Sequence, residues 1–474
     1  MRNRSIQCLL WVQFTILFAP WAATAWEHHP LLTKPILSTL SEVTEAAPAP
    51  ATPLETFLMD VEADLAGLLE AEETWARTNL ASYKPRPDAL AFAATGNAGD
   101  IRDRFFKAIR VNPNIRTPLY LSPLAGVSTA SKRRLDPGEV SILRDTSNLS
   151  IFDFVALDPG EPAGAADVVA TASNEPDYGM DIGLFEDNGT EFGLYYGFGV
   201  QPFGNPGLDY GSQAPFHMGF YHESPLVFLF ASFLKESYPE YRIHLFKSLS
   251  KFAFDRGHDY WGWRFMGWGL HYLGDLSMPY HTTALPGYST LRMLFINLLD
   301  MLGWSTPKDH AVQLSSNRHV ALETFEGIVM EDALRRNDTQ QPMLAALLQP
   351  RTVPAYADSV PRARIAKASH DMNLKMDKAI VQYMPAHFVN DPLIELGNLP
   401  VRYQIVELIE SAHGADAVTR LEQLQAEALS SFAIHGRGYV KAIRQPEKQD
   451  GASDSASAPL AAFLASMARA ALGL

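Results

Sequence analysis

Residues 269–281 read Gly269-Leu270-His271-Tyr272-Leu273-Gly274-Asp275-Leu276-Ser277-Met278-Pro279-Tyr280-His281. His271 and Asp275 stand four positions apart, so a helix places both side chains on one face. Pro279 ends that helix, and the turn after it can bring His281 back toward the same face. Two imidazoles and a carboxylate that converge among apolar residues form a donor set suited to zinc.

A second histidine and carboxylate have the same spacing in His319-Val320-Ala321-Leu322-Glu323. Apolar residues on the other side of this segment predict a second helix. Two such helices packed side by side would direct five ligands at one interior site, as helix bundles do when they hold metal ions. Either pair alone is more often a core histidine with a local partner. The metal prediction therefore depends on both pairs and on the N-terminal segment described below.

Apolar residues recur at helical spacing through much of the chain. Residues 44–54 are rich in Pro and Ala, and residues 83–215 in Gly, Pro, Asp and Asn, so loops are expected there, with short strands in the longer segment. Helices are expected at 55–80, 225–236, 240–254, 260–276, 289–303 and 318–335, and within 360–444. The sequence predicts a mainly α fold: a multi-helix bundle that encloses a metal cluster and carries long loop-rich insertions.

Composition narrows the class of protein. The chain has 474 residues, 47% of them hydrophobic, which is ample for a large core. Its net charge of −14 counts mildly against a nucleic-acid substrate, because such a surface repels phosphate backbones. The sequence contains no Gly-rich phosphate loop, no G-x-S-x-G elbow and no H-E-x-x-H motif.

The first 25 residues resemble a secretory signal peptide. Arg2 and Arg4 precede an apolar stretch that ends near Trp21, and Ala23-Thr24-Ala25 fits a signal peptidase site. The apolar stretch is short for the alternative, a membrane anchor. We therefore expect a secreted or periplasmic protein. The only cysteine, Cys8, would be removed with the signal, so the ligands must offer oxygen and nitrogen.

Cleavage after Ala25 would leave Trp26 at the N-terminus of the mature chain. Its free amine and carbonyl could then chelate a metal ion, and His29 stands where a helix is expected to begin. The helical domain is expected to span residues 26–444. Residues 445–474 are expected to form a flexible linker and a short amphipathic tail rich in Ala and Leu.

An N-terminal Trp, H-x-x-x-D-x-x-x-P-x-H and H-x-x-x-E, in that order, resemble the zinc-dependent phospholipase C and S1/P1 nuclease superfamily. The wording is closest to the phospholipase C branch, since the nucleases more often read Gln-Pro-Leu-His where this chain has Met278-Pro279-Tyr280-His281. Pro176-Asp177-Tyr178 resembles the sequence around the family's early aspartate. His217 is the candidate for the histidine that follows. His222 stays an alternative, because the family places two aromatic residues directly after this histidine. His28 is likewise an alternative to His29.

The resemblance implies three zinc ions. The first would be held by Asp177, His217, His271 and Asp275. The second would be held by the Trp26 amine and carbonyl, His29 and Asp275, which bridges the two ions. The third would be held by His281, His319 and Glu323. Asp177 would also orient or deprotonate the attacking water.

The implied activity is that of an exported zinc metallohydrolase that cleaves phosphodiester bonds, foremost a phospholipase C acting on glycerophospholipids. The expected partner is a phospholipid substrate, with peripheral contact to a membrane. Residues 291–304 are strongly apolar and would form either a lipid-facing helix or a core helix. Two alternatives stay open. One is a single-strand nuclease or 3′-nucleotidase, which would bind nucleic acid. The other is a non-catalytic secreted zinc-binding protein.

Overall fold

The computed structural model of the chain describes residues 28–124, 132–349 and 351–445. The expected signal peptide, Trp26, and the linker and tail after Gln445 lie outside the described residues. The described residues up to Ile443 cluster as one compact unit. All the elements discussed below belong to this unit, apart from Arg444, the last residue of the last helix.

The prediction of a mainly α fold is confirmed. The described residues contain eighteen α-helices and four strands, each of two residues. Strand β1 (Ala49–Pro50) pairs antiparallel with β4 (Pro162–Ala163), and β2 (Tyr120–Leu121) pairs antiparallel with β3 (Val155–Ala156). These strands tie together the loop-rich insertions, and the helices carry the core.

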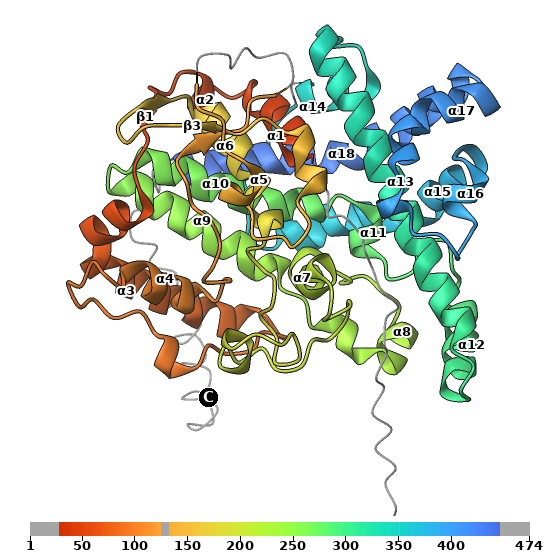
Figure 1. Cartoon of the computed structure of the whole chain (residues 1–474), viewed down its shortest axis with the longest axis horizontal. Helices are drawn as coiled ribbons and strands as arrows, with labels where there is room; N and C mark the ends of the chain where they lie inside the picture. Colours follow the sequence, from red (N-terminus) through yellow and green to blue (C-terminus); the bar gives the residue numbers. More distant parts are fainter. Residues whose placement is uncertain (1–27, 125–131, 350, 446–474) are drawn as a thin grey trace, which may run out of the picture. The chain divides into compact units, whose positions relative to one another are not determined.

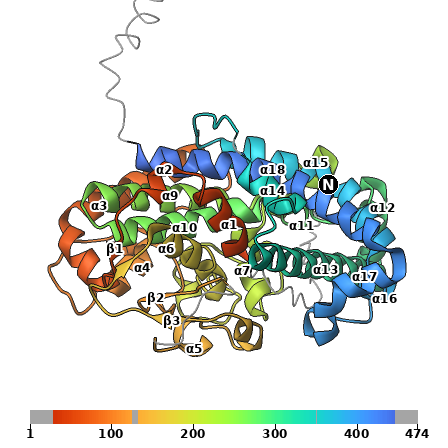
Figure 2. The same cartoon turned by 90° about the horizontal axis from the view of Figure 1, so that it is seen from above.

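Helix α10 (Asp259–Asp275) is central to the bundle and packs against α9 (Pro239–Asp255) and α6 (Ala165–Ala172), as Figures 1 and 2 show. Helix α1 (His29–Leu37) lies against α6 and α10. From Tyr260 onward every residue of α10 is buried. A helix buried on all sides needs apolar residues on most of its surface, which explains the dense aromatic composition of α10 around Arg264, His271 and Asp275.

Glycines in α10 allow its neighbours to come close. A Cβ atom added at Gly267 would lie 2.5 Å from the carbonyl oxygen of Val169 in α6. A Cβ atom at Gly269 would overlap the hydroxyl of Tyr439 in α18 (Ala415–Arg444). Both helices therefore touch the backbone of α10 directly, which fixes the position of the histidine and aspartate at its end.

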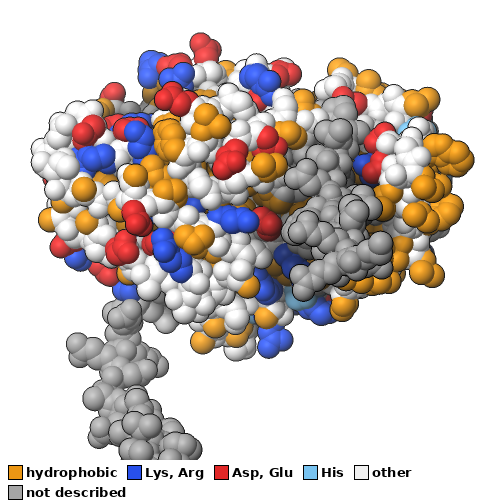
Figure 3. All heavy atoms as spheres, turned by 90° about the horizontal axis from the view of Figure 1, so that it is seen from below, with side chains coloured by type: hydrophobic (Ala, Val, Ile, Leu, Met, Phe, Trp, Pro, Cys, Tyr) orange, Lys and Arg blue, Asp and Glu red, His pale blue; other side chains and the backbone are white. Residues whose placement is uncertain are grey.

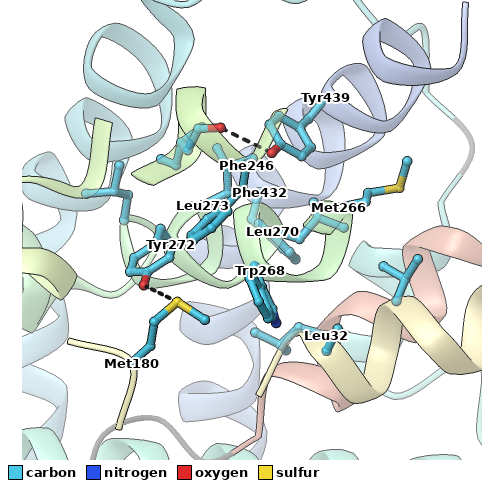
Figure 4. Close-up of a cluster of buried hydrophobic side chains, with 14 of the residues drawn as sticks. Leu32, Met180, Phe246, Met266, Trp268, Leu270, Tyr272, Leu273, Phe432 and Tyr439 are labelled. Atoms are coloured by element: carbon cyan, nitrogen blue, oxygen red, sulfur yellow. Dashed lines mark hydrogen bonds between the residues drawn. The ribbon is translucent and has the colours of Figure 1, made fainter. Parts of the chain in front are cut away.

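The apolar residues around α10 belong to the main buried cluster of the unit, part of which Figure 4 shows. Leu270 and Leu273 of α10 lie in one buried cluster with Phe246 of α9 and Phe432 of α18. The hydroxyl of Tyr439 donates a hydrogen bond to the carbonyl oxygen of Ile243 at 3.2 Å, which joins α18 to α9. This packing restrains the last turns of α10.

The expected helices are found, with two corrections to their bounds. The segment expected as one helix at 225–236 is broken after Phe230 into α8 (Pro225–Phe230) and a 3-10 turn, Ser232–Lys235. The helix expected at 318–335 begins well before that, as α13 (Thr306–Arg336), because Pro307 occupies the first turn, where no donor is lost. The remaining helices are α2 (Ser41–Thr44), α3 (Leu54–Asn79), α4 (Ile101–Ile109), α5 (Pro137–Val140), α7 (Asp209–His217), α11 (Pro279–Thr282), α12 (Thr290–Met301), α14 (Pro342–Leu348), α15 (Lys367–Tyr383), α16 (Ala386–Val389) and α17 (Ile405–His413).

No helix within the described residues combines the length and the apolar character needed to cross a bilayer.

Candidate metal centre

The predicted ligands that fall within the described residues come together in the interior of the unit. They are contributed by α1, α7, α10, α11, α13 and the 3-10 turn Glu175–Tyr178. All of them are buried: His29, Asp177, His217, His271, Asp275, His281, His319 and Glu323. Trp26, the ninth predicted ligand, lies outside the described residues.

The chain reverses at Pro279, and this brings His281 back toward the end of α10. Helix α10 ends at Asp275, and Met278 is extended before Pro279 opens the short helix α11. His281 thereby turns back, with its Nδ1 atom 3.3 Å from Oδ1 of Asp275. Its Nδ1 atom also lies 3.1 Å from the carbonyl oxygen of His217. The reversal expected from the sequence is present.

A first group of donor atoms has the spacing of a tetrahedral metal site. The Nδ1 atom of His217 lies 3.0 Å from Nε2 of His271 and 3.0 Å from Oδ2 of Asp275. The Nε2 atom of His271 lies 3.3 Å from the same Asp275 oxygen. Oδ1 of Asp177 lies 3.6 Å from each of these two histidine nitrogens. Zinc ligands at about 2.0–2.1 Å in a tetrahedron are about 3.3–3.4 Å apart, so the His217, His271 and Asp275 atoms have nearly the spacing that one ion requires. Asp177 lies at the edge of this group and also forms a group with His29 and His271.

The two carboxylate oxygens of Asp275 face different histidines. Oδ1 of Asp275 lies 3.5 Å from Nε2 of His29, while Oδ2 faces His217 and His271. The His29 nitrogen is also 3.8 Å from Oδ2 of Asp177. Both carboxylates therefore present one oxygen to the first group and the other to His29. This arrangement allows Asp275 to bridge two neighbouring ions.

A further group consists of His281, His319 and Glu323. Nε2 of His319 and Oε1 of Glu323 are 2.7 Å apart, and Nε2 of His281 lies 3.7 Å from the same oxygen. The His319 nitrogen and this Glu323 oxygen approach each other, but neither forms a well-oriented hydrogen bond to a described residue. A buried donor or acceptor without a partner is costly. A bound cation would satisfy both atoms.

Burial keeps three imidazoles of the site in the neutral form. Burial lowers the pKa of His319 to about 3, and burial together with the neighbouring histidines holds the pKa values of His29 and His271 below their usual range. Burial raises the pKa of the Glu323 carboxyl well above normal. A metal ligand must be deprotonated, so His29, His271 and His319 are already in the form that binds, and Glu323 must release a proton when it binds.

His217 and Asp275 titrate differently because they face each other. Burial disfavours a charge on His217, but hydrogen bonds to Asp181 and Asp275 outweigh it and raise its pKa to about 10. Burial likewise opposes a charge on Asp275, but the nearby His271, His281 and His217 hold its pKa well below normal. The carboxylates thus create a place for positive charge, which a proton or a metal ion can fill.

Asp181 is a functional candidate that the sequence analysis missed. Its Oδ2 atom lies 3.4 Å from Nε2 of His217, on the far side of the ring from the donor group. Arg242 donates to Oδ1 from Nε at 3.0 Å and from Nη2 at 2.6 Å, and the Tyr272 hydroxyl donates to Oδ2 at 2.5 Å. The one local signal for Asp181 in the sequence is its position four residues after Asp177. The partners come from distant segments.

Other partners orient the remaining ligands. Nδ1 of His271 lies 2.8 Å from the carbonyl oxygen of Ser173, which leaves Nε2 to the donor group. The Tyr280 ring stacks on His319 with centroids 5.6 Å apart. The Tyr280 hydroxyl donates to Oδ1 of Asp377 at 3.0 Å, and Arg318 donates to the same oxygen. These contacts are of the kind that fix ligand orientation in metal sites.

The two alternative ligands lie elsewhere. His28 packs against Phe152, with ring centroids 6.0 Å apart, and burial lowers its pKa to about 4. Nε2 of His222 lies 2.8 Å from the carbonyl oxygen of Arg362. Among the described residues neither belongs to a group of histidine and carboxylate atoms placed to hold an ion, whereas His29 and His217 do.

Comparison of the chain with protein-family models, curated proteins and solved structures found no match. What the structure itself contains is a set of buried histidine, aspartate and glutamate side chains whose atoms are placed so that they could hold a metal ion.

Proposed function

We propose that this chain is a zinc-dependent phosphodiester hydrolase of the phospholipase C type, exported before it acts. One observation carries the proposal: Asp275 divides its two oxygens between separate groups of buried donors. A structural site needs only one ion in a closed shell, whereas adjacent ions that share a carboxylate are typical of enzymes that act on phosphate esters.

The donor chemistry suits zinc. The described ligands offer imidazole nitrogen and carboxylate oxygen, and the separations in the first group match a tetrahedral ion. We assign three ions. One is held by Asp177, His217, His271 and Asp275; the next by His29 and Asp275, with Trp26 as the resemblance implies; and the third by His281, His319 and Glu323.

When bound, such ions lower the pKa of a coordinated water and neutralise charge on phosphoryl oxygens. The protein's own residues supply the rest. Asp177 directs Oδ1 toward His217 and His271 and Oδ2 toward His29, so its carboxylate stands between two donor groups. From there it can accept a hydrogen bond from the attacking water and take up its proton. Asp275, through its two oxygens, fixes the distance between the donor group around His217 and the one around His29.

The proposed substrate is a glycerophospholipid, cleaved on the glycerol side of the phosphate to give diacylglycerol and a phosphorylated head group. The phospholipase-like wording around His271–His281 and at His319–Glu323 supports this choice. The acidic net charge of −14 also disfavours long polyanions. The metal-binding residues themselves recognise only the phosphate, so the head group is selected by other residues.

The decisive assay compares phosphatidylcholine with single-stranded DNA at equal phosphate concentration, using the zinc-loaded protein. We expect diacylglycerol, lost on chelation and restored by zinc. Asp275→Asn should abolish the activity, while Asp416→Asn, at an exposed carboxylate in the first turn of α18, should leave it unchanged.

Other outcomes would point to other functions. Chelator-sensitive release of nucleotides without diacylglycerol would identify a nuclease with the same metal site. Bound zinc with no hydrolysis of either substrate would identify a binding protein.

A further inference from the structure

Two short segments expose an unusual amount of apolar side chain. They are α8 and α12 with the turn that follows α12. We call their exposed apolar residues the α8–α12 surface: Leu226, Leu229, Phe230, Leu291, Phe295, Leu298, Met301, Leu302 and Trp304. Half of the exposed large hydrophobic side chains among the described residues lie in this surface. Figure 3 shows hydrophobic side chains gathered on the right-hand side of one face, where Figure 1 places α12.

The surface rests on an ordered base. Met293 and Ile296 point inward from α12 and are buried, and Met293 joins an apolar cluster with Val227 of α8 and Val312 of α13. Helices α8 and α12 also contact each other. The sequence left open whether residues 291–304 face lipid or the core. The structure shows that the helix has a core face and an outer face, and that both are apolar.

The outer face of α12 departs from the usual pattern of a surface helix. Such a helix places polar residues where it meets water. Here the exposed positions other than Arg292 hold Leu291, Phe295, Leu298 and Met301, and Trp304 follows in the turn at 69% exposure. A contiguous apolar patch on a soluble unit marks a contact site for protein or lipid.

Charge distinguishes between these partners. The chain has an excess of acidic residues, yet no carboxylate is exposed on α12 or in the turn up to Thr306, all of which is described. Asp300 is instead paired with Lys308, at 2.6 Å from Oδ2 to Nζ. Arg292 is the one exposed charge on the helix, with its guanidinium 4.2 Å from the centre of the Tyr288 ring.

A second copy of the chain is a poor occupant. A two-fold interface places the same surface on both subunits, so Arg292 would meet an apolar face without a carboxylate. A phospholipid layer accommodates both the charge of Arg292 and the apolar side chains around it. Its phosphates pair with an arginine, and its acyl boundary accepts Leu, Phe and Trp side chains.

We propose that the α8–α12 surface inserts into the interfacial layer of a phosphatidylcholine bilayer, with Arg292 at the level of the phosphates. The choice of lipid rests in part on the phospholipase function proposed above. Helix α13, which carries His319 and Glu323, begins directly after this surface. Insertion would therefore attach the membrane contact to a helix of the metal centre.

The test is co-sedimentation of the full zinc-loaded protein with phosphatidylcholine vesicles. We expect the wild-type protein to sediment and the variant Phe295→Ser/Leu298→Ser to partition at least tenfold less. The matched control is Leu194→Ser/Val200→Ser, which removes two side chains of similar exposure outside the surface and should sediment like the wild type. Asp275→Asn should also sediment, because insertion needs no catalysis.

The outcomes separate this inference from the proposed function. Hydrolysis of a soluble short-chain phosphatidylcholine without vesicle binding would overturn the surface and leave the function standing. Vesicle binding without hydrolysis of any phosphatidylcholine would support the surface and refute the function. Equal loss of binding in both double variants would overturn the proposal. So would a dimer in light scattering that Phe295→Ser/Leu298→Ser dissociates, if no vesicle binding is seen.

Discussion

The imidazole of His217 lies between two aspartates, with Nδ1 3.0 Å from Oδ2 of Asp275 and Nε2 3.4 Å from Oδ2 of Asp181. One nitrogen thus faces the donor group and the other faces a buried carboxylate. Asp181 is itself held by Arg242 and Tyr272. This carboxylate–histidine pairing sets which nitrogen is free to bind an ion and how the ring is turned.

Replacing Asp181 by Asn should weaken zinc binding by about 10- to 100-fold, because the imidazole loses the negative charge beside its Nε2 atom and with it part of its basicity. Competition with a chromophoric chelator measures the affinity directly. Asp181→Asn also leaves the buried Arg242 without its counter-ion, so thermal unfolding must be followed in parallel. Tyr272→Phe removes only the hydroxyl that donates to Asp181, so it should cause a smaller loss of zinc affinity. Unchanged zinc affinity in a folded Asp181→Asn protein would contradict this role.

His319 and Glu323 should behave as one site. Their facing atoms are 2.7 Å apart and both are buried, so the loss of either removes a ligand of the same ion. We expect His319→Ala and Glu323→Ala each to remove about one zinc per chain, as measured by atomic absorption, and to lose activity alike. The double variant should resemble the singles, because interacting positions are not additive. A double variant much worse than either single would show that the two residues act apart.

The central helix should not tolerate a methyl group where α6 crosses it. Gly267→Ala places a Cβ atom 2.5 Å from a backbone oxygen of Val169, and we expect a loss of about 1–3 kcal/mol in the free energy of unfolding. Gly67→Ala in α3 is the matched control, since a Cβ atom there meets nothing within 4 Å. That control should be neutral or stabilising by about 0.5–1 kcal/mol, because alanine is the better helix former. Urea unfolding of the two variants decides the point.

A histidine outside the metal centre should give the stability a pH dependence. Nδ1 of His244 lies 2.7 Å from Oε2 of Glu72, and Nε2 lies 3.5 Å from Oδ2 of Asp358. Burial opposes a charge on this ring, but the two carboxylates outweigh it and raise its pKa above 6.5. The stabilisation is therefore complete below pH 6.5 and is lost as the pH rises through the folded-state pKa.

His244→Gln should accordingly reduce the free energy of unfolding more at pH 6 than at pH 9, in zinc-saturated protein. Urea titrations of wild type and variant at both pH values measure this difference. A penalty that is the same at both pH values would show that the ring is neutral in the folded protein.

Local spacing made parts of the site predictable. His271 and Asp275, like His319 and Glu323, are pairs whose common helix face follows from the helical repeat alone. The choice of His217 over His222 could not be made in this way, because it depends on how α7 ends against α11. Asp181 and Arg242 are 61 residues apart in the chain, so no local pattern links them. The exposure of α12 was also undetermined, since a helix that is apolar on both faces has the same composition wherever it lies.

The described ligands extend along the chain from His29 to Glu323, and α1 touches both α10 and α13 only in the folded unit. Contacts between such distant positions form late, because a long loop must close before they gain anything. A nascent or truncated chain that lacks α13 therefore has no complete set of donors. If the chain is the hydrolase proposed above, its activity depends on the finished fold, and we expect a polypeptide that still lacks α13 to be inactive.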